Sequence, residues 1–159
     1  MKKVIYLLSI VLTTVVFIII YVILKYFSSS SLSGGGSNLV STIRDGKTES
    51  SYSGNIQVSQ NQQKGLVFSY TAWILIDDFS YKYGEPKIVF TKGTPDLKIS
   101  CPALVIDSNT NSLLIYIDTY GSKEIIPISN IPAKKWLHVG IVVDQYSTNI
   151  YINGTLHTH

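Results

Sequence analysis

An uninterrupted apolar run opens the chain and covers residues 4–24. A helix rises about 1.5 Å per residue, so this run would span roughly 31 Å, close to the roughly 30 Å hydrocarbon core of a bilayer. Two lysines and the amino terminus precede the run, whereas only Lys25 follows it closely. Because positive flanks stay in the cytoplasm, residues 1–3 are predicted to be cytoplasmic and the rest to cross the membrane. The pattern predicts a single-pass protein that contacts the lipid bilayer through residues 4–24 and has an extracytoplasmic C-terminal part.

A cleaved signal peptide is the alternative interpretation of this run. Signal peptides have an apolar core of about 7–15 residues, followed by a cleavage site with small residues of the Ala-x-Ala kind. The run here is longer, and no such site precedes the serines that begin at Ser28. The length favours an anchor that is retained, and both interpretations place the C-terminal part outside the cytoplasm.

A polar segment separates this run from the rest of the hydrophobic pattern. Residues 28–37 are almost entirely serine and glycine, and the chain stays polar to Gln63. Such a composition has nothing to bury and is typical of a flexible linker, here predicted over residues 25–63. The remaining residues, 64–159, suffice for one small domain.

Short apolar stretches with a period of two residues, separated by polar turns, fill residues 64–159. Strands are predicted at residues 66–76, 87–92, 103–107, 113–119, 124–128, 136–144 and 148–152. Asn153-Gly154 follows the last of them and is a strong hairpin signal, because both central positions of that turn need a positive φ. The spacing predicts an all-β, antiparallel, two-sheet jelly-roll sandwich. Trp73 and Trp136 lie within predicted strands and are expected in its core, and His138 is expected to be structural.

The charge content gives no indication of nucleic-acid binding, and the cysteine content excludes an internal disulfide. After Phe27 the chain holds ten basic and ten acidic residues, so the clustered positive charge that nucleic-acid binding needs is not indicated. Cys101 is the single cysteine, which excludes a disulfide within the chain. Its thiol is either free and partly buried or paired with a cysteine of another chain.

Four ordered segments resemble a known family. They are residues 68–73 (FSYTAW), 88–93 (IVFTKG), 136–144 (WLHVGIVVD) and 150–154 (IYING). Together they resemble laminin-G-like domains of the concanavalin A-like lectin/glucanase superfamily. The resemblance implies a jelly roll that binds carbohydrate or protein ligands outside the cell. Domains of this family continue beyond the last of these segments, so residues 64–159 are expected to be C-terminally incomplete, as a fragment or as a domain that a partner completes.

Catalysis is not predicted. Glucanases of this fold use carboxylates in an E-x-D-x-x-E arrangement, and this sequence has no such spacing. Nucleophile-elbow and phosphate-loop motifs are missing as well. No catalytic residue is therefore assigned.

Residues in the predicted turns are the candidates for ligand contacts. Exposed aromatic rings can stack on a sugar, and the tyrosines in turns are Tyr81, Tyr83, Tyr120 and Tyr146. Carboxylates could supply oxygen ligands for calcium, the one cofactor considered, and the candidates are Asp77, Asp78 and Asp107. Asn153 begins an N-glycosylation sequon. Ordinary turn chemistry is the alternative explanation for each of these residues.

These features lead to one functional hypothesis and two alternatives. The hypothesis is a membrane-anchored, extracytoplasmic, non-catalytic recognition module whose partner is a glycan or a surface protein. The first alternative is a structural or assembly protein of a viral envelope or cell surface. The second is the N-terminal fragment of a glycoside hydrolase whose acidic residues lie further along the chain.

Overall fold

The computed structural model describes residues 2–29, 36–52, 56, 61–62, 65–144 and 146–159. The chain divides into two compact units, Met1–Ile43 and Arg44–His159. The predicted linker, residues 25–63, lies partly outside the described residues.

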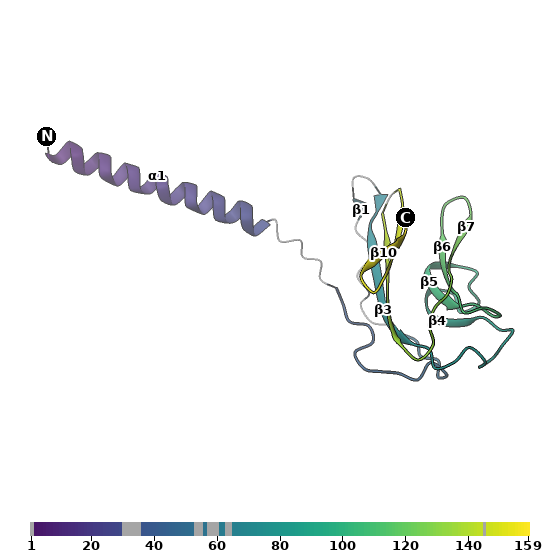
Figure 1. Cartoon of the computed structure of the whole chain (residues 1–159). Helices are drawn as coiled ribbons and strands as arrows, with labels where there is room; N and C mark the ends of the chain where they lie inside the picture. The colour runs from purple at the N-terminus through teal and green to yellow at the C-terminus, as the bar shows by residue number, and fades with distance from the viewer. Residues whose placement is uncertain (1, 30–35, 53–55, 57–60, 63–64, 145) are drawn as a thin grey trace. The chain divides into compact units, whose positions relative to one another are not determined.

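The first unit holds one helix, α1, over Lys2–Ser29 (Figure 1). It forms because the apolar run contains neither glycine nor proline and therefore nothing that breaks a helix. The hydroxyl of Thr14 donates a hydrogen bond of 2.8 Å to the carbonyl oxygen of Val11, so the polar side chain is satisfied by its own helix.

The membrane prediction for this segment is wrong. Among the residues that the structure describes, no helix combines the length and the apolar character needed to cross a bilayer. The transmembrane helix at residues 4–24, the single-pass localisation and the extracytoplasmic placement are corrected accordingly. The bilayer contact expected through the same residues loses its basis.

The second unit is a β-sandwich, which confirms the predicted all-β, antiparallel, two-sheet architecture (Figure 1). One sheet has the strand order β10-β9-β8-β3 and the other β4-β5-β6-β7. The strands of the first sheet are β3 (Phe68–Leu75), β8 (Trp136–Val143), β9 (Thr148–Ile152) and β10 (Thr155–Thr158). Those of the second are β4 (Lys87–Gly93), β5 (Ser100–Ile106), β6 (Leu113–Asp118) and β7 (Lys123–Ile128). Two strands of two residues each, β1 (Asn61–Gln62) and β2 (Gly65–Leu66), pair with each other and precede β3.

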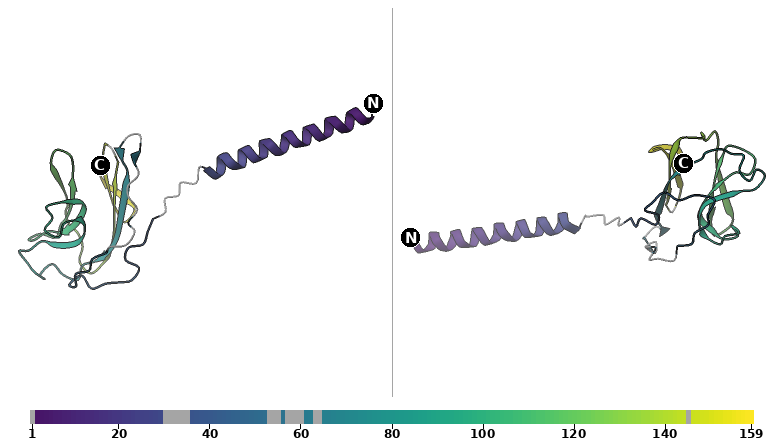
Figure 2. Two further views of the ribbon diagram at one scale, coloured as in Figure 1. Left: turned by 180° about the vertical axis from the view of Figure 1, so that it is seen from behind. Right: turned by 90° about the horizontal axis from the view of Figure 1, so that it is seen from below.

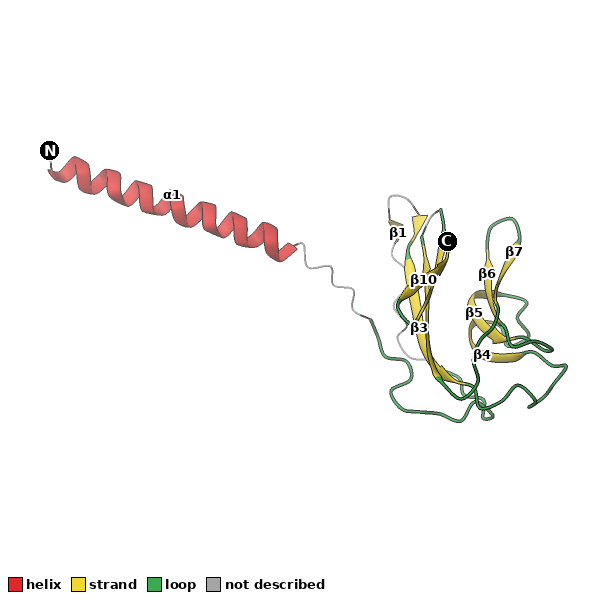
Figure 3. Ribbon diagram, viewed as in Figure 1, coloured by secondary structure: helices red, strands yellow, loops and turns green. Residues whose placement is uncertain are grey.

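The core lies between the two sheets, which face each other in all the views (Figures 2 and 3). Alternate residues of each strand turn inward, as a strand requires. In β6, for example, Leu113, Ile115 and Ile117 are buried and the residues between them are not. Buried side chains from both sheets and from the segments that join them form one cluster: Ile74, Ile76, Leu104, Leu113, Ile115, Ile117, Ile128, Ile131, Leu137, Val139, Ile141 and Ile150.

Loops at one end of the sandwich are tied together by backbone hydrogen bonds. The amide of Gly84, in the β3–β4 loop, donates to the carbonyl of Ser108 in the β5–β6 turn at 2.9 Å. The amide of Lys134, which precedes β8, donates to the carbonyl of Ile76 at 2.7 Å. We call this end the β3–β4 end. The strand registers place the β6–β7 and β8–β9 turns at the opposite end.

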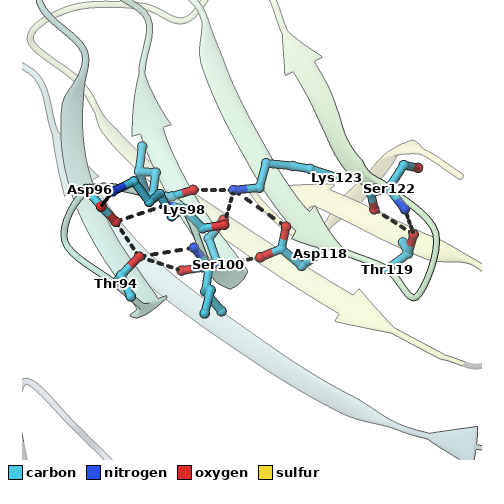
Figure 4. A network of polar contacts seen from close by, with 10 residues as sticks. Thr94, Asp96, Lys98, Ser100, Asp118, Thr119, Ser122 and Lys123 are labelled. Carbon is cyan, nitrogen blue, oxygen red and sulfur yellow. Dashed lines mark hydrogen bonds and ion pairs between the residues drawn. The ribbon is translucent and has the colours of Figure 1, made fainter.

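A polar network fastens the turn between β4 and β5 to the β6–β7 hairpin (Figure 4). The ammonium of Lys123 lies 3.5 Å from a carboxylate oxygen of Asp118. It also donates to the carbonyl of Leu97 and, at 3.1 Å, to that of Lys98. The second carboxylate oxygen of Asp118 accepts the amide hydrogen of Ser100 at 2.5 Å. The start of β5 is thus held by side chains that come from β6 and β7.

Candidate functional site: an aromatic sheet face

The outer surface of the β10-β9-β8-β3 sheet carries large aromatic and aliphatic side chains. Because Ile74, Leu137 and Ile150 point into the core, their neighbours along each strand point outward. We call this surface the outer face. Its residues are Ser69, Thr71, Trp73 and Leu75 of β3, Trp136, His138, Gly140 and Val142 of β8, Asn149 and Tyr151 of β9, and Leu156 of β10.

The two tryptophans are exposed, so their predicted place in the core is wrong. Trp73 has 65% and Trp136 47% of its surface exposed. The register pairs Trp73 with His138 and Leu75 with Trp136 across β3 and β8. The rings of Trp73 and His138 have centroids 4.9 Å apart and are inclined by 42°. The outer face therefore offers two indoles on neighbouring strands, one of them packed beside an imidazole.

Gly140 leaves the middle of the outer face without a side chain. A β-carbon at this position would lie 3.4 Å from the β-carbon of Tyr151 and 3.9 Å from the γ-methyl of Thr71. Both neighbours come from strands that flank β8, and Gly140 itself is buried between them. A glycine inside a strand often marks a place where another group approaches the backbone closely. Here it removes the one side chain that would stand between the hydroxyl-bearing residues Thr71 and Tyr151.

The β9–β10 turn fixes the backbone at His138. Asn153 and Gly154 have φ values of 50° and 81°, as the predicted Asn-Gly turn requires. The side-chain oxygen of Asn153 accepts the amide hydrogen of His138 at 3.0 Å, and the Asn153 amide donates to the His138 carbonyl at 2.9 Å. Asn153 thus has a structural role in positioning the outer face, and its glycosylation stays a prediction.

The four tyrosines chosen from the sequence are exposed but do not form one site. Tyr81 and Tyr83 lie in the β3–β4 loop, whereas Tyr120 and Tyr146 lie in the turns at the opposite end of the sandwich. The ammonium groups of Lys47 and Lys82 lie 5.0 and 6.0 Å from the centroid of the Tyr81 ring. Such cation–π contacts occupy a ring that a sugar would otherwise stack on.

The carboxylates considered for calcium are engaged in their own turns. Asp78 accepts hydrogen bonds from the amide and hydroxyl of Ser80 at 2.7 and 2.5 Å. Asp107 accepts from the amide and hydroxyl of Thr110 at 3.0 and 2.6 Å. Over the described ranges, Asp77 included, no three His, Cys, Asp or Glu side chains gather closely enough to hold a metal ion. These contacts are those of ordinary turns.

Hydrogen bonding in the turns lowers the pKa of four carboxyl groups. The hydroxyl of Thr94 and then the amine of Lys98 are the main causes that lower the pKa of Asp96 to about 2. The pKa of Asp78 is lowered chiefly by the Ser80 hydroxyl, that of Asp107 by the Thr110 hydroxyl, and that of Asp144 by the Tyr146 amide. The single thiol behaves in the opposite way, since burial raises the pKa of Cys101.

We expect the free energy of unfolding to fall as the pH drops from about 4 to about 2. The folded pKa of Asp96 lies below its unfolded value of about 3.9, so the unfolded chain binds more protons in this window. The stabilisation is therefore complete above the unfolded pKa and is lost as the pH falls through the folded one. Asp96→Asn should flatten the dependence, measured by urea unfolding at a series of pH values. An unchanged slope in this variant would contradict the assignment to Asp96.

Comparisons with known proteins do not identify a family. No family model matches the chain, and no solved structure matches it. SH2 domain-containing protein A of Arabidopsis thaliana is 26% identical over an alignment of 117 positions, which covers 64% of this chain. The chain spans 18% of that relative's length. The name of the relative describes a much longer protein, and at this identity it assigns no family to the chain.

Proposed function

We propose that the chain is a non-catalytic recognition module that binds carbohydrate on the outer face of its jelly-roll sandwich. The observation that carries the proposal is the exposed indole pair of Trp73 and Trp136 beside His138. One face of a sugar ring presents C–H groups that pack on an aromatic ring, while its hydroxyls bond to polar groups nearby. Thr71, Tyr151 and Asn149 carry such groups on the same face. The resemblance to laminin-G-like and concanavalin A-like lectin domains supports the same function.

Four turn carboxyl groups with shifted pKa values do not have the character of a glycosidase's general acid. A glycosidase needs a general acid whose pKa is raised, so that it still holds a proton near neutral pH. The shifts found for Asp78, Asp96, Asp107 and Asp144 are all downward, and their causes are hydrogen bonds within turns. These groups are ionised at neutral pH and serve the fold.

Glycan-array binding of the full chain, with and without the Trp73→Ala and Trp136→Ala substitutions, tests the proposal. We expect the wild type to bind a subset of glycans and each substitution to weaken binding by at least about tenfold, because a central aromatic contact carries much of the affinity. Removing an exposed indole should leave the core intact, which thermal unfolding of the same samples would verify.

Tyr120→Ala and Tyr146→Ala are the matched controls, since they remove exposed aromatic rings at one end of the sandwich and leave the outer face unchanged. Normal glycan binding is expected for both. Binding that depends on these tyrosines and not on the tryptophans would move the site to the turns. A wild-type protein that binds no glycan would refute the proposal. Addition of calcium in a parallel array shows whether any binding depends on this ion.

A further inference from the structure

Residues of the outer face follow one another in steps along β3 and β8. The register sets three successive pairs opposite one another: Leu75 with Trp136, Trp73 with His138, and Thr71 with Gly140. We call these six residues the β3–β8 row. A strand rises about 3.4 Å per residue, so Trp136 and Gly140, four residues apart on β8, are separated by about 14 Å. The row therefore has a long axis that runs along the two strands.

The apolar side chains in the first two pairs of the β3–β8 row are open to a ligand. Leu75 has 50% of its surface exposed, and both indoles are exposed as described above. Trp73 and Trp136 come from neighbouring strands and are one pair apart, a diagonal spacing of about 7–8 Å that large aromatic rings can bridge. Two aromatic contacts in succession suit a ligand that repeats along its length, because each repeat meets a similar surface.

The third pair of the row offers polar contacts in place of apolar ones. The register sets Thr71 of β3 and Tyr151 of β9 opposite Gly140, one on each side. Thr71 is exposed and Tyr151 is half-buried. A group that lies over Gly140 can approach the backbone closely and can reach a hydroxyl on either side.

The composition of the β3–β8 row suits an uncharged ligand. Each of its six residues, all within the described part of the chain, is of a type other than Asp, Glu, Lys or Arg. Sulfated and sialylated glycans carry anionic groups, which proteins bind through charge-assisted hydrogen bonds from arginine or lysine. A neutral glycan needs apolar ring contacts and neutral hydrogen-bonding groups instead, and the row supplies both.

We propose that the β3–β8 row binds the interior of a linear β-1,4-linked glucan, whose chain lies along the two strands. The inference rests on the carbohydrate-binding function proposed above. The substituents and linkages of each ring in this glucan are equatorial, so both ring faces present C–H groups that pack on aromatic rings. One ring lies over Trp136, the next over Trp73, and a third over Gly140. The row is about 14 Å long, which is more than one ring covers, so several sugar units take part.

Calorimetric titration of the full chain with glucose, cellobiose, cellotriose, cellotetraose and cellohexaose tests the inference. The affinity should rise by at least about tenfold from cellobiose to cellotetraose, because only the longer chain reaches from Trp136 to Gly140, and it should then change little toward cellohexaose. Raising the NaCl concentration from about 50 to about 500 mM should leave the affinity unchanged, since salt screens charges and this ligand carries none.

Gly140→Ala tests the position of the third ring. A β-carbon there would lie 3.4 Å from that of Tyr151, an ordinary van der Waals contact, and Gly140 has no positive φ, so the variant should fold. The added methyl group takes the place of the ring. The affinity for cellotetraose should therefore fall about tenfold, whereas that for cellobiose, which the indoles hold, should change less than about twofold. Gly121→Ala, in the β6–β7 turn, is the matched control and should bind as the wild type does.

Thr71→Val provides an independent test of the same position. The substitution removes one hydroxyl and keeps the branched shape of an exposed strand residue, so the fold should be retained. Loss of one hydrogen bond should weaken cellotetraose binding about threefold or more. Thermal unfolding of both variants shows whether they are folded.

The outcomes separate this inference from the function on which it rests. Equal affinities for cellobiose and cellotetraose, full cellotetraose affinity in both Gly140→Ala and Thr71→Val, or binding of other glycans in the array but of none of these oligosaccharides would overturn the inference and leave carbohydrate binding in place. A wild-type protein that binds no glycan would overturn both.

Discussion

Replacing Gly93 by alanine is expected to lower the free energy of unfolding by about 4 kcal/mol or more, one of the rare large effects of a single methyl group. Gly93 ends β4 at the register shift opposite Ser100. A β-carbon there would overlap the carbonyl oxygen of Ile99 and lie 2.6 Å from its carbonyl carbon. These atoms belong to the backbone, and the same carbonyl accepts the amide hydrogen of Thr94 at 2.8 Å, so the turn cannot yield locally. The midpoint of urea unfolding measures the loss.

Two other glycines provide the matched controls for this substitution. Gly84 has a φ of 87°, but in the described part of the chain nothing lies within 4 Å of the position of its β-carbon. Gly84→Ala should therefore cost only the backbone strain, about 1 kcal/mol. Gly121 has open space and no strained φ, so Gly121→Ala should be close to neutral. Equal effects at the three positions would show that the close approach at Gly93 is not what matters.

The sandwich could be predicted from the sequence because its strands are local patterns. Period-two stretches and polar turns gave seven of the strands in the right order, and the Asn153-Gly154 turn has the backbone angles that its residues demand. The helix over the apolar run could be predicted in the same way. The prediction that this helix crosses a bilayer was wrong, because no helix among the described residues has the length and apolar character that a span needs.

The outer face could not be predicted, because both sets of alternating residues in β3 contain large apolar side chains. Ile74 alternates with Trp73 and Leu75, so the sequence does not say which set faces the core. The second sheet decides this, since it covers Ile74 and leaves Trp73 exposed. A signal was present in β8, where Gly140 shares a phase with Trp136 and His138, while the other phase is purely aliphatic. The sequences of β3 and β8 taken together therefore indicate which alternate residues of these strands point outward.

The network around Asp118 was not predicted either, because its members are far apart in the sequence. Lys123 and Leu97 are separated by 26 positions, and Ser100 and Asp118 by 18. Only the strand order β4-β5-β6-β7 brings them together at one end of the second sheet. Acidic and basic residues at strand ends have the appearance of solvated turn residues until the register is known.

Removing the carboxylate of Asp118 is the second substitution from which we expect a large loss, about 2–4 kcal/mol for Asp118→Ala. The amide of Ser100 would lose its acceptor in a residue that is fully buried, which costs about 1–3 kcal/mol. The hydroxyl of Ser100 already has no partner among the described residues, so it offers no compensation. The ammonium of Lys123 would also lose its carboxylate partner. Urea unfolding monitored by tryptophan fluorescence gives the difference.

Asp118→Asn separates the two contributions to this loss. The amide oxygen of asparagine can still accept the hydrogen bond from Ser100, whereas the charge opposite Lys123 is removed. Because both side chains of the ion pair are about a quarter exposed, the pair itself should contribute only about 1 kcal/mol, and less at high salt. Asp118→Asn is therefore expected to retain most of the stability that Asp118→Ala loses. Equal losses in the two variants would show that the ion pair, and not the buried amide, holds the start of β5.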